Sequence, residues 1–283
     1  MTTAFASASA PVSSSTTPAQ AFARDGYLLV RNLLPATRLE PVRSAIDARV
    51  AAIRAELIAE GIELPPLASS FSQNLVPLGE HLARYGRSWT EALAGSSVYH
   101  LHHAPELLDV LQELLGPHMC GHKQFNLRPK LPGQELTTVP WHQDSGYYDP
   151  RLKDDTVLTV WMPLVTANAH NGCLQLVPGS HRTGAMEHDT DVGEGKFLQV
   201  RATPNPASVM TVEMEPGDAL IMHNLTWHCS TQNHSDGIRW SIDLRFYAGG
   251  TANASLLSHG FPRPWIVRGG QVAPLSEWES WYL

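Results

Sequence analysis

Between about residue 119 and residue 248 the sequence is a succession of short apolar segments separated by Gly, Pro, Asn and Asp, and this pattern constrains the fold more than any other feature. We interpret eight of these segments as strands, at 120–128, 136–142, 156–164, 173–177, 208–214, 219–223, 226–231 and 238–248. Short strands at such spacing are typical of β-sandwiches and barrels. The pattern therefore predicts a mainly β protein built on a double-stranded β-helix, or jelly roll.

The first third of the chain carries helical signals instead. Thr17 and Pro18 form an N-cap and a first-turn proline, and Gly26 ends this short helix before a strand at 27–31. A long helix is predicted after Pro35, because apolar residues recur every three or four positions up to Gly61: Val42, Ile46, Val50, Ile53 and Leu57. Another helix is predicted at 105–115. We expect these α-helices to flank the barrel.

Residues 21–283 are expected to form a single domain, with its barrel core at about 119–248. Residues 1–20 are rich in Ala, Ser, Thr and Pro and carry no charge, so we expect a disordered tail without the features of a secretory signal or transit peptide. The segment 249–283 is aromatic, and exposing such side chains to water is unfavourable. It is expected either to cap the barrel or to contact a second subunit in a homodimer.

Composition narrows the classes of partner. A net charge of −7 argues against nucleic acid as the main partner, and no apolar run approaches the ~18 residues that a membrane span requires. The three cysteines are not arranged as C-x-x-C, which indicates reduced thiols and a cytoplasmic location. The fourteen histidines are a weak indication of metal chemistry.

A candidate metal site begins at His142 and Asp144. On a strand, or at the extended end of one, residues two apart point to the same side, so an imidazole and a carboxylate can reach one ion. His228 lies on a later predicted strand, which a jelly roll can bring close. Two histidines and one carboxylate on one face leave coordination positions open, as Fe(II) requires when it must bind a cosubstrate and dioxygen together.

Arg239 follows His228 by eleven residues and lies on the last predicted strand, where Ser241, Asp243 and Arg245 share its face. An unpaired guanidinium buried in a barrel costs several kcal/mol, whereas a bound carboxylate would satisfy it. The planar guanidinium of Arg239 suits bidentate binding of one end of a dicarboxylate. Ser230, on the same face as His228, could donate another hydrogen bond to that carboxylate.

Together these stretches resemble the phytanoyl-CoA dioxygenase-like (PhyH) branch of the Fe(II)/2-oxoglutarate-dependent oxygenases. The resemblance covers roughly residues 22–248. It rests on Trp-His-Gln-Asp at 141–144, Asn-Gly-Cys-Leu-Gln-Leu-Val-Pro-Gly-Ser-His at 171–181, Pro-Gly-Asp at 216–218, His228 with Ser230, and Asn-His-Ser at 233–235 leading to Arg239.

The resemblance implies that His142, Asp144 and His228 are the catalytic iron ligands, that Arg239 and Ser230 bind the distal carboxylate of 2-oxoglutarate, and that Asn126 is a further cosubstrate contact. It also implies oxidation of a C–H bond of a small-molecule metabolite by dioxygen, with 2-oxoglutarate converted to succinate and CO2. Halogenases of this kind lack the carboxylate ligand, so Asp144 favours hydroxylation or a related oxidation.

Two other functions remain open from the residues alone. One is a cupin-like metalloenzyme that does not use 2-oxoglutarate, and the other is a non-catalytic metal- or ligand-binding protein on the same barrel. Four side chains are candidate substrate contacts: Gln124, Tyr147, Trp161 and Trp265. The basic residues Lys123, Arg128, Lys130, Arg151 and Lys153 are interpreted as a solvated rim, with a phosphate or CoA site as the alternative.

Overall fold

The computed structural model describes residues 17–68, 70–84, 89, 93–152, 155–251, 253–258 and 260–282. Helix α1 (Pro18–Asp25) starts inside the predicted tail, because Thr17 caps it with a reciprocal capping box, and Gly26 ends it with φ of 76°. The rest of that prediction, residues 1–16, lies outside the described residues.

One large antiparallel sheet forms the floor of the barrel. Its strands lie in the order β1 (Tyr27–Val30), β9 (Ala219–His223), β4 (Val157–Pro163), β11 (Arg239–Ala248), β2 (Met119–Gly121) and β12 (Trp265–Arg268), and β3 (Asn126–Lys130) also pairs with β11. Every residue of β4 is buried, because both faces of this sheet are covered. Leu158, Val160 and Met162 belong to the core on the helical side, whereas Trp161 belongs to the core inside the barrel.

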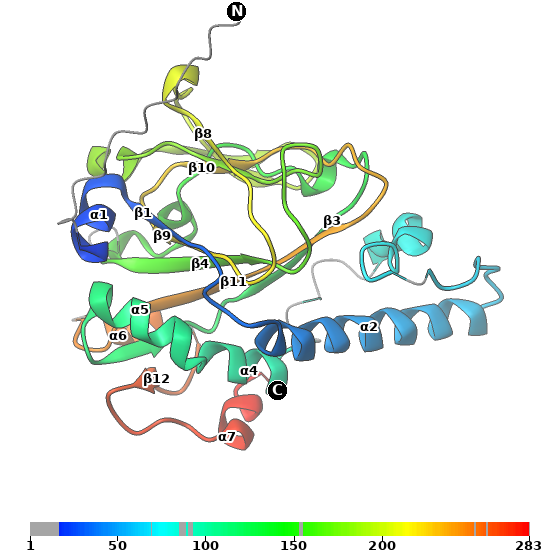
Figure 1. The fold of residues 1–283 in the computed structure, drawn as a ribbon, viewed down its shortest axis with the longest axis horizontal. Coiled ribbons are helices and arrows are strands. Elements are labelled where there is room, and N and C mark those ends of the chain that lie inside the picture. The colour runs from blue at the N-terminus through cyan, green and yellow to red at the C-terminus, as the bar shows by residue number, and fades with distance from the viewer. Residues whose placement is uncertain are drawn as a thin grey trace, which may run out of the picture.

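A smaller sheet closes the barrel from the opposite side. It contains β10 (His228–Ser230), β5 (Leu174–Leu176) and β8 (Met210–Val212), in that order. Figure 1 shows β8 and β10 above β4 and β11. Leu174 and Val212 from the small sheet share one hydrophobic cluster with Trp161 and Met222 from the large sheet. The predicted jelly-roll core is therefore confirmed.

The outer face of the large sheet is covered by α2 (Ala36–Ala59), α4 (Ser96–His102) and α5 (Pro105–Leu115). The predicted stripe of α2 is buried, including Ile46, Val50 and Leu57 at 0% exposure. Each such side chain contributes about 1.5–3 kcal/mol through burial. Shorter helical segments complete the layer: η1 (Val76–Arg84), α6 (Ala254–Leu257) and α7 (Leu275–Ser280).

Two predicted strands differ from the structure. Segment 120–128 forms two strands, β2 and β3, instead of one. Gly121 and Asn126 are five residues apart in the sequence, but their partners on β11, Phe246 and Asp243, are only three residues apart. The extra residues between β2 and β3 form a bulge. Segment 136–142 is instead the 3-10 turn η2 (Glu135–Thr137) followed by extended chain. Pro140 lies in that extended chain and has no N–H for a ladder.

Three strands were not predicted. β6 (His188–Val192) and β7 (Phe197–Val200) form a hairpin beside the barrel, and β12 extends the large sheet. Both hairpin strands carry polar residues that hide the apolar alternation, so periodicity did not reveal them.

The segment 249–283 does not cap the barrel mouth as expected. It contributes β12 to the edge of the large sheet and packs α7 against α4, on the helical side of the molecule. Trp265 and Trp278 are fully buried within the chain itself, so no second subunit is needed to cover them. No helix among the described residues is long and apolar enough to cross a membrane.

Candidate active site

The two histidines of the predicted metal site lie opposite each other in the barrel. His142 and His228 form an isolated antiparallel bridge, with both N–H to O distances at 3.0 Å. His228 begins β10, and Asp144 begins the turn η3 (Asp144–Tyr147) just after the bridge. Residues distant in sequence therefore meet because the extended chain before η3 joins the edge of the small sheet.

The ligand atoms of this triad converge on one point. The Nδ1 atoms of His142 and His228 lie 2.9 Å from the carbonyl oxygens of Pro140 and Thr226. An imidazole that donates from Nδ1 keeps its lone pair on Nε2, the atom a metal needs. The two Nε2 atoms lie 3.6 and 3.8 Å from Asp144 Oδ1. The three ligand atoms lie within 4.8 Å of one another, which fits a facial Fe(II) site.

The second oxygen of Asp144 is held away from this point. Thr159 donates a hydrogen bond of 2.5 Å to Oδ2, and Arg245 Nη2 lies 3.7 Å from the same atom. Burial alone would raise the pKa of Asp144, but Arg245 and the two imidazoles hold that pKa well below its usual range. Burial, together with His142, lowers the pKa of His228 to about 4. The carboxylate is thus ionised and this imidazole is neutral at pH 7, as metal ligation requires.

Arg245 connects the triad to a buried charge network. Its Nη1 donates to Asp243 at 2.8 Å and its Nε donates to Tyr148 at 3.0 Å. Asp243 also accepts hydrogen bonds from Asn126 at 2.7 Å and from Arg128 at 2.9 Å. Burial tends to raise the pKa of Asp243, but Arg128 and Arg245 lower it below the usual value. Among the described residues at this end of the barrel, Asp144, Asp243 and Arg245 each have an opposite charge beside them.

Arg239 has a different environment. It is 2% exposed, its Nη1 donates to Ser241, and its guanidinium lies 5.3 Å from the ring centroid of Trp161. Its buried Nε has no hydrogen-bond partner among the described residues. Burial, and then Arg128, lowers the pKa of Arg239 to about 9, so it remains a cation at pH 7. An orphaned donor on a buried cation fits a carboxylate ligand.

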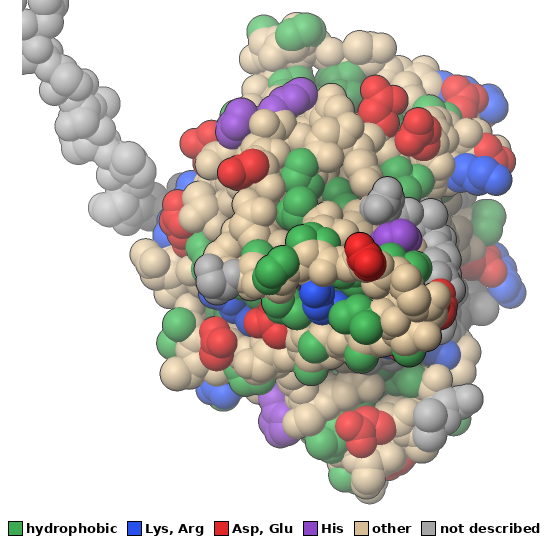
Figure 2. Space-filling view, turned by 90° about the vertical axis from the view of Figure 1, so that its right-hand side faces the viewer, with side chains coloured by type: hydrophobic (Ala, Val, Ile, Leu, Met, Phe, Trp, Pro, Cys, Tyr) green, Lys and Arg blue, Asp and Glu red, His purple; other side chains and the backbone are tan. Residues whose placement is uncertain are grey.

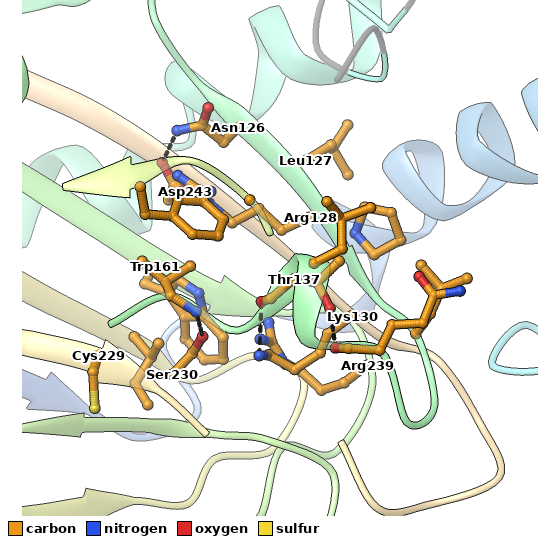
Figure 3. A pocket seen from close by; sticks show the side chains of 18 of the residues that line it. Asn126, Leu127, Arg128, Lys130, Thr137, Trp161, Cys229, Ser230, Arg239 and Asp243 are labelled. Atoms are coloured by element: carbon orange, nitrogen blue, oxygen red, sulfur yellow. Dashed lines mark hydrogen bonds and ion pairs between the residues drawn. The ribbon is translucent and has the colours of Figure 1, made fainter. Parts of the chain in front are cut away.

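The metal-ligand triad and the Arg239 region open into one cavity of about 860 Å³ (Figure 3). Its lining includes the triad, Arg239, Ser230, Asn126 and Trp161. Ser230 accepts a hydrogen bond from the Val139 N–H at 3.1 Å, which leaves its own hydrogen available. Figure 2 shows a face on which a Lys or Arg side chain lies recessed in a hollow among hydrophobic side chains. A cavity of this size suits a small molecule.

Only one of the four predicted substrate contacts, Trp161, lines this cavity. Gln124 lies in the bulge before β3, where its carbonyl oxygen accepts a hydrogen bond from Arg245 at 3.4 Å, and its side chain is not part of the cavity lining. Tyr147 packs against His142 but is 41% exposed outside the lining, and its hydroxyl accepts from Leu198 N–H.

The prediction for Trp265 is wrong. It is 0% exposed on β12, where its ring contacts His102, Tyr99 and Trp278 on the helical side of the large sheet. The large sheet separates it from the cavity. An aromatic residue in a terminal segment gives no periodic signal that could show which face it covers.

Four side chains at the site were not predicted as site residues: Thr159, Asp243, Arg245 and Lys130. Asp243 and Arg245 lie on the same face of β11 as Arg239, because alternate residues of a strand share a face. This alternation could have identified them as site residues from the sequence. The interpretation of the basic cluster as a solvated rim is wrong for Lys130, which is 1% exposed and lines the cavity. Arg128 also lines it and is 40% exposed. Lys153 lies outside the described residues.

Comparison with known proteins agrees with this geometry. Residues 22–241 match the sequence pattern of the phytanoyl-CoA dioxygenase (PhyH) family. The chain belongs to this family. The expected resemblance is thereby confirmed.

Curated relatives of the family include human peroxisomal phytanoyl-CoA dioxygenase, which is 24% identical over 230 residues, covering 80% of this chain and 66% of that protein. The 1-deoxypentalenic acid 11-beta-hydroxylase of Streptomyces arenae is 32% identical over 155 residues, covering 50% of this chain and 53% of that protein. The chain thus spans about two thirds or less of the length of these relatives.

A solved structure shares the fold. The apo form of the non-heme monooxygenase ThoJ superposes with a TM-score of 0.64 at 21% identity, covering 91% of this chain and 85% of that chain. At this identity the likeness shows the architecture alone.

Proposed function

We propose that this protein is a non-haem Fe(II)/2-oxoglutarate-dependent dioxygenase that hydroxylates, or otherwise oxidises, a C–H bond of a small metabolite. In the overall reaction dioxygen supplies one oxygen atom to the product and one to succinate, and 2-oxoglutarate loses CO2. One observation carries the proposal. Three metal-ligand atoms converge in the same cavity as a buried arginine whose Nε has no partner.

The residues of the site would have different roles. His142, Asp144 and His228 would hold iron, which supplies the oxidising chemistry when bound and keeps positions open for the keto acid and dioxygen. Arg239 and Ser230 would bind the distal carboxylate of 2-oxoglutarate. The Trp161 ring beside Arg239 would exclude water from that ion pair, which strengthens it.

Anaerobic addition of Fe(II) and 2-oxoglutarate tests this function. The expected result is the visible charge-transfer band of an iron-chelated keto acid, followed by succinate release when dioxygen and a substrate are supplied. Metal binding without the band would favour a cupin-like enzyme that does not use 2-oxoglutarate. A band without succinate release over a broad metabolite panel would favour a binding protein.

We further propose a small-molecule substrate and a cytoplasmic location. The cavity volume supports the first. The second is supported by Cys120, Cys173 and Cys229, which are all free and buried, as in proteins of reducing compartments. Cell fractionation with an antibody to the protein tests the location, and recovery in an organelle fraction would contradict it.

A further inference from the structure

Among the residues that the structure describes, Lys130 is the one lysine that lines the cavity, and it is 1% exposed. Its Nζ donates to the Thr137 carbonyl oxygen at 2.8 Å (Figure 3). An ammonium group has three donors, so two remain for a ligand. Lysines normally place the charged end in water, and one that does not needs an explanation.

The pairing of β3 with β11 places this lysine beside Arg239. Lys130 and Arg239 are direct cross-strand partners, so their side chains project from the same face of the sheet into the cavity. Asn126 and Asp243 are partners in the same ladder and form a hydrogen bond of 2.7 Å. The ladder thus ends in two basic side chains side by side, and it would be destabilised if both were charged, because like charges in directly opposite positions destabilise a sheet.

No carboxylate neutralises this pair. Among the described residues, neither Lys130 nor Arg239 forms an ion pair, whereas Arg128 and Arg245 both pair with Asp243. The stem of Lys130 is confined by Gly172, where an added Cβ would lie 2.5 Å from Lys130 Cδ. The ammonium is therefore kept in the cavity rather than free to reach solvent.

We propose that Lys130 is a second cation of the 2-oxoglutarate site, which binds the distal carboxylate together with Arg239, and that it takes up one proton from solvent when the cosubstrate binds. The proposal rests on the proposed function. It assigns to this lysine a positioning role and a pH dependence of cosubstrate binding.

The groups that face Lys130 explain why it would take up a proton when the cosubstrate binds. Burial, and then Arg239 on β11, lowers the pKa of Lys130 to about 6, and Arg128 on β3 acts in the same direction. Cys229 on β10 also faces Lys130, and its thiol is neutral at pH 7 because burial raises its pKa to about 12. The Thr137 carbonyl oxygen completes these surroundings. A bound carboxylate would favour the ammonium form, so binding near neutral pH requires a proton.

Calorimetry of 2-oxoglutarate binding to the anaerobic Fe(II) protein tests this coupling. At pH 7.5, titrations in buffers of different ionisation enthalpy should show close to one proton taken up by the wild type. Lys130→Met should show none, whereas Lys123→Met is the matched control and should behave as wild type. Lys123 lies outside the cavity, where it contacts the rings of Phe261 and Tyr282.

The affinity should follow the same linkage. Between pH 6.5 and 8.5 the wild-type Kd should rise by up to about tenfold per pH unit, while that of Lys130→Met stays nearly flat. At pH 6.5 the variant should bind about 10- to 100-fold more weakly, the usual effect of losing a hydrogen bond to a charged group.

Binding without proton uptake by the wild type would overturn the role of Lys130 and leave the proposed function intact. Equal uptake by Lys130→Met would do the same. A wild type that binds no 2-oxoglutarate would overturn both. The wild-type measurement decides the question even where the variant folds poorly.

Discussion

The two ends of the barrel cavity are both charged, but they balance their charges differently. At the metal end, Asp144 and Asp243 face Arg245, and Arg128 supplies a further cation. At the other end, Arg239 and Lys130 face each other without an anion among the described residues. The metal end is therefore electrostatically complete within the chain, whereas the cosubstrate end becomes balanced only when an anionic ligand binds.

This difference predicts opposite consequences for removing a charge. Removing one member of a compensated buried pair leaves the other unpaired, which is strongly destabilising. Removing an uncompensated buried cation relieves a desolvation cost and should not destabilise the free protein. Stability and ligand binding should therefore change together at the metal end and in opposite directions at the cosubstrate end.

The largest effect is expected for Asp144→Ala. Without the carboxylate that we propose as an iron ligand, the site should lose Fe(II) binding and succinate release to below detection, measured by metal analysis and turnover. Asp149→Ala is the matched control, because that partly exposed carboxylate pairs with Arg151 and does not line the cavity. Retained iron and turnover in Asp144→Ala would exclude this carboxylate as a ligand.

Arg245→Met is expected to lower the free energy of unfolding by about 3–5 kcal/mol, because it leaves two buried carboxylates without their shared cation. Chemical denaturation measures this change. Iron affinity should fall as well, by about 10- to 100-fold, since Arg245 orients the Asp144 ligand. Unchanged stability would show that the metal end is not the compensated network described above.

Arg239→Met is expected to weaken 2-oxoglutarate binding by about 100-fold, since it removes the main partner of the distal carboxylate. Unfolding of the ligand-free protein should not become easier, in contrast to Arg245→Met. Calorimetry and denaturation of the same sample check both statements. Wild-type cosubstrate affinity in this variant would remove Arg239 from the site.

A smaller effect is expected in the pH dependence of stability. The pKa of Lys130 is about 6 when folded and about 10.5 when unfolded, so the unfolded chain binds the extra proton between these values. The contribution of Lys130 to the free energy of unfolding should therefore rise with pH, by up to about 1.4 kcal/mol per unit. Relative to wild type, Lys130→Met should be stabilised more at pH 7 than at pH 8. A constant difference between the two proteins would show that Lys130 stays charged.

Local patterns in the sequence were sufficient for much of this protein. The succession of short strands predicted the barrel, and the motifs that contain His142, Asp144, His228 and Arg239 predicted the family. The ligand atoms of His142, Asp144 and His228 lie within 4.8 Å of one another in the structure. The helical stripe of α2 was equally evident, because burial on one side imposes a repeat that single residues display.

Only the tertiary structure decided which polar residues share a cavity. Lys130 looked like one more solvated lysine until the ladder placed it opposite Arg239, and Gln124 looked like a pocket residue until the bulge removed it from β3. The position of Trp265 on the helical side of the large sheet became clear only from the path of the C-terminal segment. Strand register and bulges depend on partners far away in the chain, so the periodicity of one segment determines which residues share a face but not what that face meets.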